Sequence, residues 1–191
     1  MNTTMSVFDY FPVLETPRLI LRRITEADAA DLFAVFSDDA VTEHYDLYTF
    51  EDLDEAYDLV EYFDDSYQYE RQIRWGIERR EDGRLLGTCG FVALYEHRGE
   101  IGYELGRAYW RQGYMREALA ALLAYGFMEM ELNRIEAMTV PANVASAALL
   151  RSLGFTEEGI LREYDYFKEE YQDLRCFSLL RREYDAASPA T

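Results

Sequence analysis

The stretch YWRQGYMREAL, residues 109–119, places a single glycine between bulky aromatic residues and the start of an Ala/Leu-rich run. Residues 100–106, before it, are predicted to form a strand, and residues 114–130 have leucine and phenylalanine at helical spacing. Gly113 therefore stands at the start of a predicted helix. The unpaired amide groups of a first helical turn and the helix dipole make an anion site, and glycine lets a ligand approach the backbone closely.

Arginines surround this glycine in a chain that is otherwise strongly acidic. The formal net charge is −18, yet residues 105–116 hold Arg107, Arg111 and Arg116 and no acidic residue. This local positive charge indicates that an anion binds nearby. An ordinary strand-to-helix turn with surface arginines would explain the same residues. The stretch is neither a glycine-rich Rossmann turn nor a Walker loop, because it has a lone glycine and no Lys-Ser/Thr after it.

The length of 191 residues suits one domain, and the composition disfavours several functions. With 2 histidines and no C-x-x-C pattern we predict no metal site, and Cys89 and Cys176 are expected to be packed thiols. The longest apolar run, residues 118–128, is too short to span a membrane, and no signal peptide is evident. We therefore expect a cytoplasmic protein that binds neither membrane nor nucleic acid. Its negative charge either attracts cationic partners or serves solubility alone.

The rest of the chain alternates between strand and helix patterns without repeats. Thr25 is predicted to cap a helix with Asp28 at its third position, and Asp82–Gly83 is a hairpin turn signal. Strands are expected near residues 19–24, 71–81, 84–95, 100–106, 134–140, 155–164 and 173–182, and helices near residues 26–36, 50–63, 114–130 and 143–153. This order predicts a mixed sheet flanked by helices.

Taken together, these segments resemble the GNAT N-acetyltransferase superfamily, in its RimJ/RimL-like branch. The coenzyme A motif of that family, Q/R-x-x-G-x-G/A, stands here as residues 110–115, with Trp110 and Met115 departing from the pattern. Further matches are TPRLILRRITEAD, GEIGYEL, LNRIEAMTVPANVASAALLRSLGF and EEGILREY, in the family's order. The resemblance covers residues 14–184 as a single domain, with an N-terminal extension at residues 1–13 and a frayed tail at residues 185–191.

The resemblance implies an α/β (α+β) GNAT fold: a mixed, mostly antiparallel sheet of about seven strands with about four helices. The sheet is splayed between its fourth and fifth strands, here residues 100–106 and 134–140, and the pantetheine arm of acetyl-CoA lies in the gap. The residues implied in cofactor binding are Leu105, Gly106, Arg107, Arg111, Gln112, Gly113, Tyr114, Met115, Arg116, Asn143 and Ser146.

Acetyl transfer to an amine needs a base for the amine proton, a donor for the oxyanion and a proton for the leaving thiolate. Glu100 and Glu104 share one face of their strand by alternation. Glu100 matches the family's base position and Glu104 lies closer to the cofactor, although either could be a solvated acid or a partner for an arginine. A backbone amide near Leu105 is the candidate oxyanion donor.

Asn143 and Ser146 begin a predicted helix and could simply cap it. The resemblance implies that Asn143 bonds the pantetheine arm and that Ser146 reaches the sulfur. The position of the family's usual tyrosine acid holds Leu150, which favours Ser146 or water as the proton donor.

The acceptor side is expected to involve the loop with His44, Tyr45 and Tyr48 and the facing segment with Tyr164, although aromatic residues are more often core or interface. The resemblance implies transfer from acetyl-CoA to a primary amine by direct attack in a ternary complex. The acceptor is a protein N-terminal α-amine or a small amine, and a homodimer is allowed. The alternative is a non-catalytic acyl-CoA-binding or sensor protein.

Overall fold

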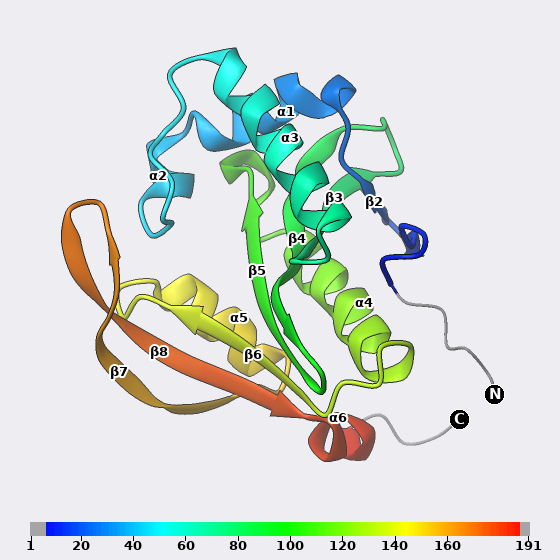
Figure 1. The fold of residues 1–191 in the computed structure, drawn as a ribbon, viewed down its shortest axis with the longest axis vertical. Coiled ribbons are helices and arrows are strands. Elements are labelled where there is room, and N and C mark those ends of the chain that lie inside the picture. Colours follow the sequence, from blue (N-terminus) through cyan, green and yellow to red (C-terminus); the bar gives the residue numbers. More distant parts are fainter. Residues whose placement is uncertain (1–6, 188–191) are drawn as a thin grey trace.

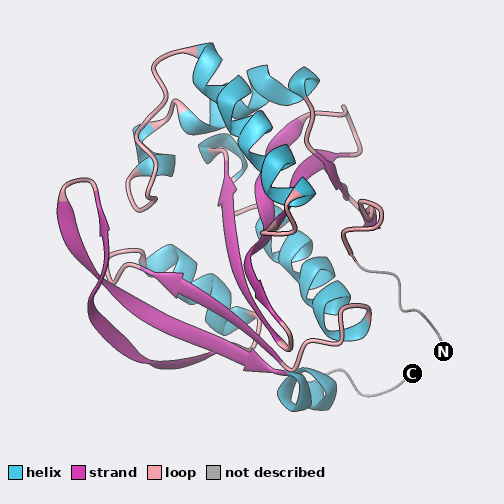
Figure 2. Ribbon diagram, in the orientation of Figure 1, coloured by secondary structure: helices cyan, strands magenta, loops and turns pink. Residues whose placement is uncertain are grey.

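The computed structural model describes residues 7–187, which form one sheet with helices on both faces (Figures 1 and 2). The strand order is β1-β2-β3-β4-β5-β6-β8-β7. The strands are β1 (Leu14–Glu15), β2 (Leu19–Arg23), β3 (Ile73–Arg79), β4 (Leu85–Tyr95), β5 (Arg98–Leu105), β6 (Arg134–Thr139), β7 (Thr156–Phe167) and β8 (Glu170–Leu180). The α-helices are α1 (Ala29–Phe36), α2 (Asp39–Thr42), α3 (Leu53–Gln68), α4 (Tyr114–Met128), α5 (Val144–Ser152) and α6 (Arg181–Ala187). The predicted mixed, mostly antiparallel sheet is confirmed.

The sheet opens between β5 and β6, as predicted. These two strands run parallel, and their register covers only Arg98–Glu100 against Arg134–Glu136. The remaining part of β5 stays paired with β4, up to Leu105 opposite Gly87. Figure 1 shows the two strands diverging from their paired ends near α6. The opening therefore leaves the backbone of the second half of β5 facing a gap rather than a neighbouring strand.

Three short elements were not expected from the sequence: β1, α2 and α6, of 2, 4 and 7 residues. Each is too short to show a hydrophobic period, and so pattern reasoning misses it. Residues 185–187 belong to α6 rather than to a frayed tail, and residues 188–191 lie outside the described residues. The start of the predicted N-terminal extension, residues 1–6, also lies outside them, and the domain limits 14–184 stay a prediction.

Two hydrophobic clusters cover opposite faces of the sheet. Leu85 and Leu86 are neighbours on β4 and so point to opposite faces. Leu86 packs in the larger cluster with residues of α4 and α5, and Leu85 packs in the smaller cluster with residues of α1 and α3. The sheet that opens between β5 and β6 therefore has α4 and α5 on one face and α1 and α3 on the other.

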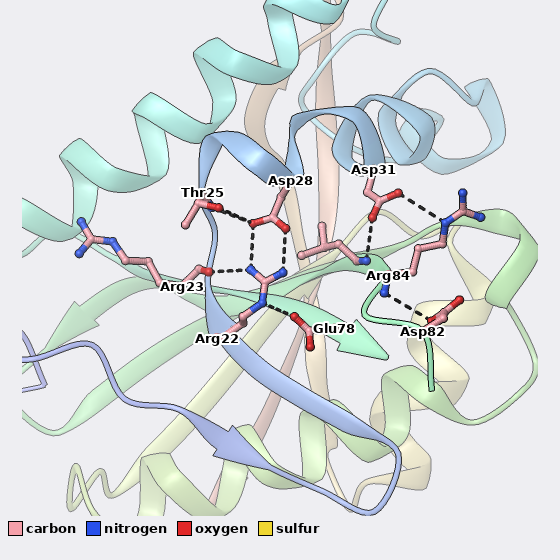
Figure 3. A network of polar contacts seen from close by, with 9 residues as sticks. Arg22, Arg23, Thr25, Asp28, Asp31, Glu78, Asp82 and Arg84 are labelled. Atoms are coloured by element: carbon pink, nitrogen blue, oxygen red, sulfur yellow. Dashed lines mark hydrogen bonds and ion pairs between the residues drawn. The ribbon is translucent and has the colours of Figure 1, made fainter. Parts of the chain in front are cut away.

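A partly buried polar network fixes the chain where β2 leads into α1 (Figure 3). The predicted Thr25 capping box with Asp28 is present, although the first turn is a 3-10 helix, Glu26–Asp28, ahead of α1. Arg22 donates to both Asp28 oxygens, Nη1 to Oδ2 at 2.9 Å and Nη2 to Oδ1 at 2.7 Å, and its Nε donates to Glu78. Burial works against the Asp28 charge, but the Arg22 and Thr25 hydrogen bonds hold its pKa below the usual value. This ion pair anchors α1 to β2 and β3.

Candidate functional site

The loop before α4 has the geometry of an anion site. Gly113 is the N-cap of α4 and lies in the left-handed region, with φ +79°. Arg111 also has a positive φ, 60°, which is uncommon for a residue with a side chain. The left-handed turn at Gly113 leads directly into the first turn of a helix of 15 residues, whose leading amide groups have no partner inside the helix. Backbone amides and the positive end of the helix dipole therefore meet at this loop.

Arg18, on the segment before β2, supports this loop from the side. Its Nη1 donates to the Gln112 carbonyl at 3.0 Å, and its Nε pairs with Glu117 at 2.6 Å. Its guanidinium also stacks on the Tyr114 ring, 4.4 Å from the ring centroid. Burial acts against ionisation of Glu117, but hydrogen bonds from Thr16 and Arg18 lower its pKa overall. Arg18 was not found by sequence reasoning, because its contacts join segments about a hundred residues apart.

The structure explains both departures from the family motif. Trp110 Nε1 donates to the Leu105 carbonyl at 2.6 Å, so the indole ties the loop to the end of β5. Met115 is buried and packs in the larger hydrophobic cluster. At both positions the side chain stabilises the loop and leaves the backbone of residues 111–114 as the surface available to an anion.

A cavity of about 580 Å³ passes this loop and reaches through the opening of the sheet. Tyr103 and Glu104 both line it, and because they are neighbours on β5 they point to opposite faces. Its wall is formed by Ala40, Val41, Glu43, His44, Tyr45, Tyr103, Glu104, Leu105, Tyr109, Trp110, Arg111, Gly113, Tyr114, Met115, Arg116, Ala142, Asn143, Val144, Ala145, Ser146 and Leu149. One cavity thus joins the α4 and α5 helix starts to the opposite face of the sheet.

Most of the residues implied in cofactor binding line this cavity. Those on its wall are Leu105, Arg111, Gly113, Tyr114, Met115, Arg116, Asn143 and Ser146. Gly106, Arg107 and Gln112 lie outside the wall. The Gly106 amide bonds the Leu86 carbonyl at 2.8 Å, and the Gln112 side chain bonds the Ala108 carbonyl at 2.8 Å. Arg107 lies 3.9 Å from Asp38 in an exposed ion pair.

Arg111 and Arg116 remain without an acidic partner in the described part of the chain, although most arginines of this acidic protein are paired. Both are exposed at the α4 start, and both line the cavity. Two positive charges beside a helix N-terminus suit a ligand with more than one negative charge.

The end of β5 presents backbone groups to the gap. The Gly106–Leu86 hydrogen bond shows which residues of β5 bond to β4, and the preceding residue, Leu105, therefore turns its N–H and C=O away from β4. The Leu105 carbonyl accepts the Trp110 indole N–H. The Leu105 amide therefore points into the gap, as an oxyanion donor in that place must.

The start of α5 holds two polar side chains at the cavity. Asn143 is the N-cap, as predicted, and its Oδ1 accepts the Ser146 backbone N–H at 3.0 Å. Ser146 Oγ lies 2.7 Å from the Tyr103 hydroxyl. Leu150, the position of the expected tyrosine acid, is fully buried. Tyr103 was missed by sequence reasoning, which considered only the other face of its strand.

Glu104 lies on the face with α1 and α3, where it is held in a buried ion pair. Both of its oxygens accept hydrogen bonds from Arg74 Nη2, and Oε1 also accepts the Thr88 hydroxyl at 2.7 Å. Arg74 Nε in turn donates to Thr88 at 2.8 Å. The two charged side chains are 1% and 4% exposed. The Glu104 carboxylate is therefore already bound by a guanidinium and a hydroxyl of the protein itself.

Glu100, the other glutamate on this face of β5, has different surroundings from Glu104. It is half-buried at the closed end of the opening, paired in register with Glu136 across the β5–β6 ladder, and it is not part of the cavity wall. Burial raises its pKa, and the nearby carboxylates of Glu136 and Asp165 raise it further, against the opposing charge of Arg98. A carboxylate with a raised pKa is a better proton acceptor near neutral pH than an ordinary one.

The comparisons with known proteins agree with this geometry. A family profile described as Acetyltransferase (GNAT) domain matches residues 18–156. The chain belongs to the GNAT acetyltransferase family. It is 44% identical over 173 residues to the Uncharacterized N-acetyltransferase YoaA of Bacillus subtilis (strain 168), covering 90% of this chain and 98% of YoaA. From this family and this relative, the chain is an acetyltransferase. GNAT acetyltransferases use acetyl-CoA.

Two further comparisons concern acetyltransferases that are named for ribosomal proteins. The [Ribosomal protein uS5]-alanine N-acetyltransferase of Escherichia coli (strain K12) is 28% identical over 102 residues, which is 52% of this chain and 53% of that enzyme. A RimL structure, described as a ribosomal L7/L12 alpha-N-protein acetyltransferase in complex with coenzyme A, matches with a TM-score of 0.78. It is 22% identical and covers 88% of this chain and 98% of RimL, which shows the shared fold.

The face of the GNAT sheet with α1 and α3 receives parts of the predicted acceptor site. His44 and Tyr45 line the cavity, whereas Tyr48 and Tyr164 lie outside its wall and are 64% and 59% exposed. Burial raises the pKa of Tyr45, and the Glu104 carboxylate raises it further. Of the four residues predicted for the acceptor side, the structure therefore brings only His44 and Tyr45 to the cavity, which Glu104 also lines.

On this side, a hydrogen bond joins the turn between β7 and β8 to α2. Lys168 lies in the turn between β7 and β8, and its Nζ donates to the Thr42 carbonyl of α2 at 2.5 Å. Lys168 and Glu169 both have positive φ angles, 52° and 64°, as a tight two-residue hairpin turn requires. Figure 1 shows this hairpin reaching toward α2. Lys168, the single lysine of the chain, was not found from the sequence, because only the fold brings it to α2.

Two other findings concern residues 7–187. No helix in this range combines the length and the apolar character that crossing a membrane requires. The same range contains no group of three or more His, Cys, Asp or Glu residues placed to hold a metal ion. Cys89 is buried and Cys176 half-buried, and neither forms a disulfide.

Proposed function

We propose that this protein is an acetyl-CoA-dependent N-acetyltransferase that moves the acetyl group to a primary amine by direct attack in a ternary complex. The observation that carries the proposal is the single cavity that runs through the opening of the sheet. It lets a thioester enter from the face with α4 and α5 while an amine approaches from the face with α1 and α3. Holding both reactants in one cavity makes the attack effectively unimolecular.

The loop before α4 holds the diphosphate of the cosubstrate. Backbone amides of residues 111–116 bind the phosphate oxygens, and Arg111 and Arg116 add charge from the side. The left-handed Gly113 and the two arginines without acidic partners support this assignment. Acetyl-CoA supplies an activated acetyl group. Asn143 bonds the pantetheine arm, and the Leu105 amide donates to the acetyl oxygen as negative charge develops there.

Glu100 acts as the base, through water, that removes the proton from the acceptor amine. Its raised pKa favours this role. We place a water between Glu100 and the amine because Glu100 is not part of the cavity wall. Glu104 shapes the acceptor side with its charge already compensated by Arg74. The two glutamates that the sequence could not tell apart thus have different roles.

The acceptor is a protein N-terminal α-amine. The support is the relationship to the uS5-alanine N-acetyltransferase and to RimL, which act on ribosomal proteins. The cavity wall near His44 and Tyr45 is lined by residues of a surface segment, so an extended chain terminus can reach it from solvent. A small amine fits the same opening and is the competing acceptor class.

The test is consumption of acetyl-CoA by the intact protein with a panel of N-terminal peptides and small amines. We expect turnover with peptides and, in calorimetry, binding of CoA without a peptide. CoA binding without transfer to any amine would indicate a non-catalytic acyl-CoA-binding protein. No CoA binding would overturn the proposed function altogether.

Replacement of Glu100 by glutamine tests the base. The carboxylate accepts a proton only when it is ionised, so the wild-type rate rises as the pH increases through the raised pKa of Glu100. In Glu100→Gln this limb of the pH–rate profile disappears, and kcat/KM at neutral pH falls about a hundredfold. Glu96→Gln, at an exposed turn residue, is the control and keeps the wild-type profile. An unchanged profile in Glu100→Gln would remove Glu100 from this role.

A further inference from the structure

One hydrogen bond crosses the opening of the sheet on the face with α4 and α5. Tyr103 lies on β5, beyond Glu100, the last residue of β5 that is paired with β6. Ser146 lies in the first turn of α5, which follows β6. Their hydroxyl oxygens are 2.7 Å apart, and both residues line the cavity. The contact therefore joins the two arms of the sheet at the place where the thioester of acetyl-CoA would lie.

The protonation of this pair follows from its surroundings. Burial raises the pKa of Tyr103 to about 12, against the lowering effect of the Ser146 hydrogen bond, so the phenol keeps its proton at neutral pH. The two hydroxyls carry two protons, and their mutual hydrogen bond uses one of them. The other O–H is left to point at a neighbouring group. The hydrogen bond from the Ser146 amide to Asn143 fixes the backbone beneath this pair.

We propose that Tyr103 is a positioning residue that orients the Ser146 hydroxyl toward the sulfur of acetyl-CoA. Tyr103 donates to Ser146 Oγ, and the Ser146 proton then points into the cavity. This inference rests on the proposed function.

The reaction gives this hydroxyl a task. The amine nitrogen forms a bond to the acetyl carbon and releases a proton to solvent, and the carbon–sulfur bond breaks with its electron pair left on sulfur. The Ser146 O–H donates a hydrogen bond to that sulfur as its charge develops, and the thiolate then takes a proton from solvent. Hydrogen bonds to an ionised group are stronger than those to a neutral one, so the contact stabilises the transition state more than the bound thioester.

Tyr103→Phe removes the hydroxyl and keeps the ring. We expect kcat to fall about tenfold while KM for acetyl-CoA stays within about twofold, because the lost contact acts on the leaving group. Ser146→Ala should lower kcat by at least as much. The double variant should be no slower than Ser146→Ala, because Tyr103 acts only through Ser146.

Titration of bound CoA gives a readout that needs no turnover. If the hydroxyl pair donates to the sulfur, the wild-type protein favours the thiolate of CoA, and its affinity for CoA increases from acidic to alkaline pH. Calorimetry should show this increase to be about tenfold smaller in both Tyr103→Phe and Ser146→Ala. A structural role for Tyr103 would change affinity equally at all pH values.

Tyr125→Phe is the matched control, because Tyr125 packs against Trp75 and lies outside the cavity wall. It should keep wild-type kcat and the wild-type pH dependence of CoA binding. Wild-type kcat in Tyr103→Phe, or losses that add in the double variant, would overturn the positioning role. The proposed function would fail differently, since the wild-type protein itself would then bind no CoA or acetylate no amine.

Discussion

The two sides of the opening in the sheet are built in different ways. On the side with α4 and α5, backbone geometry dominates: a left-handed Gly113, the first turn of α4 and the Asn143 cap of α5. On the other side, side chains from distant segments dominate, with Arg74 holding Glu104 and Lys168 holding Thr42. The comparison teaches that the two helix starts proposed to bind the cofactor follow from local sequence, whereas the proposed acceptor side depends on contacts that only the fold creates.

The strongest test of this contrast is the buried pair on the acceptor side. Glu104→Gln leaves the charge of Arg74 buried without a counter-charge, and we expect a loss of about 3–5 kcal/mol in the free energy of unfolding. Chemical denaturation measures it. The control is Glu15→Gln, which breaks the exposed pair with Arg80 and should cost less than about 1 kcal/mol. Equal losses in the two variants would show that burial of the Arg74–Glu104 pair contributes nothing special.

The glycine at the start of α4 tests the cofactor side. Gly113→Val forces a β-branched residue into φ +79° and places a side chain where the diphosphate is expected, so CoA affinity should fall at least about tenfold. Gly83→Val is the matched control, because Gly83 has φ +71° in the β3–β4 turn with open space around it. It should lose similar stability in thermal denaturation and retain CoA affinity in calorimetry. Equal CoA affinity in the two variants would contradict the assignment of the loop.

The contact between Lys168 and Thr42 gives the smallest expected effect. Lys168→Met keeps the aliphatic stem and removes the donor to the Thr42 carbonyl, and so it loosens the hairpin over the acceptor side. We expect KM for the peptide acceptor to change about threefold, with KM for acetyl-CoA unchanged. Lys168→Arg, which keeps a charged donor, should restore most of the wild-type value. A change in KM for acetyl-CoA instead would mean that the two sides of the opening are not separate.

The sequence predicted the parts of the molecule that depend on local pattern. Alternation, helical spacing and capping rules were enough to predict three elements: the strand at 100–106, the long helix after Gly113 and the Asn143 cap. The opening between β5 and β6 was predicted from the family resemblance, because no pattern of residues indicates where two neighbouring strands separate. The resemblance also selected the loop as a coenzyme A site.

Contacts that join distant segments could not be predicted in this way. Three contacts depend on the packing of separate elements: Arg18 with the loop, Tyr103 with Ser146, and Arg74 with Glu104. The sequence did not predict a role for Tyr103, because its side chain lies on the face of β5 opposite to the two candidate bases, Glu100 and Glu104. From the sequence, either glutamate could pair with an arginine, and in the structure Glu104 does so.

The most direct test of the central claim is a crystal structure of the protein with acetyl-CoA. We expect the diphosphate on the amides of residues 111–116, with Arg111 and Arg116 at its sides. The thioester should lie between β5 and β6, within hydrogen-bonding distance of the Leu105 amide and Ser146. A nucleotide bound at another surface, or a gap between these strands that admits no ligand, would contradict the proposed site.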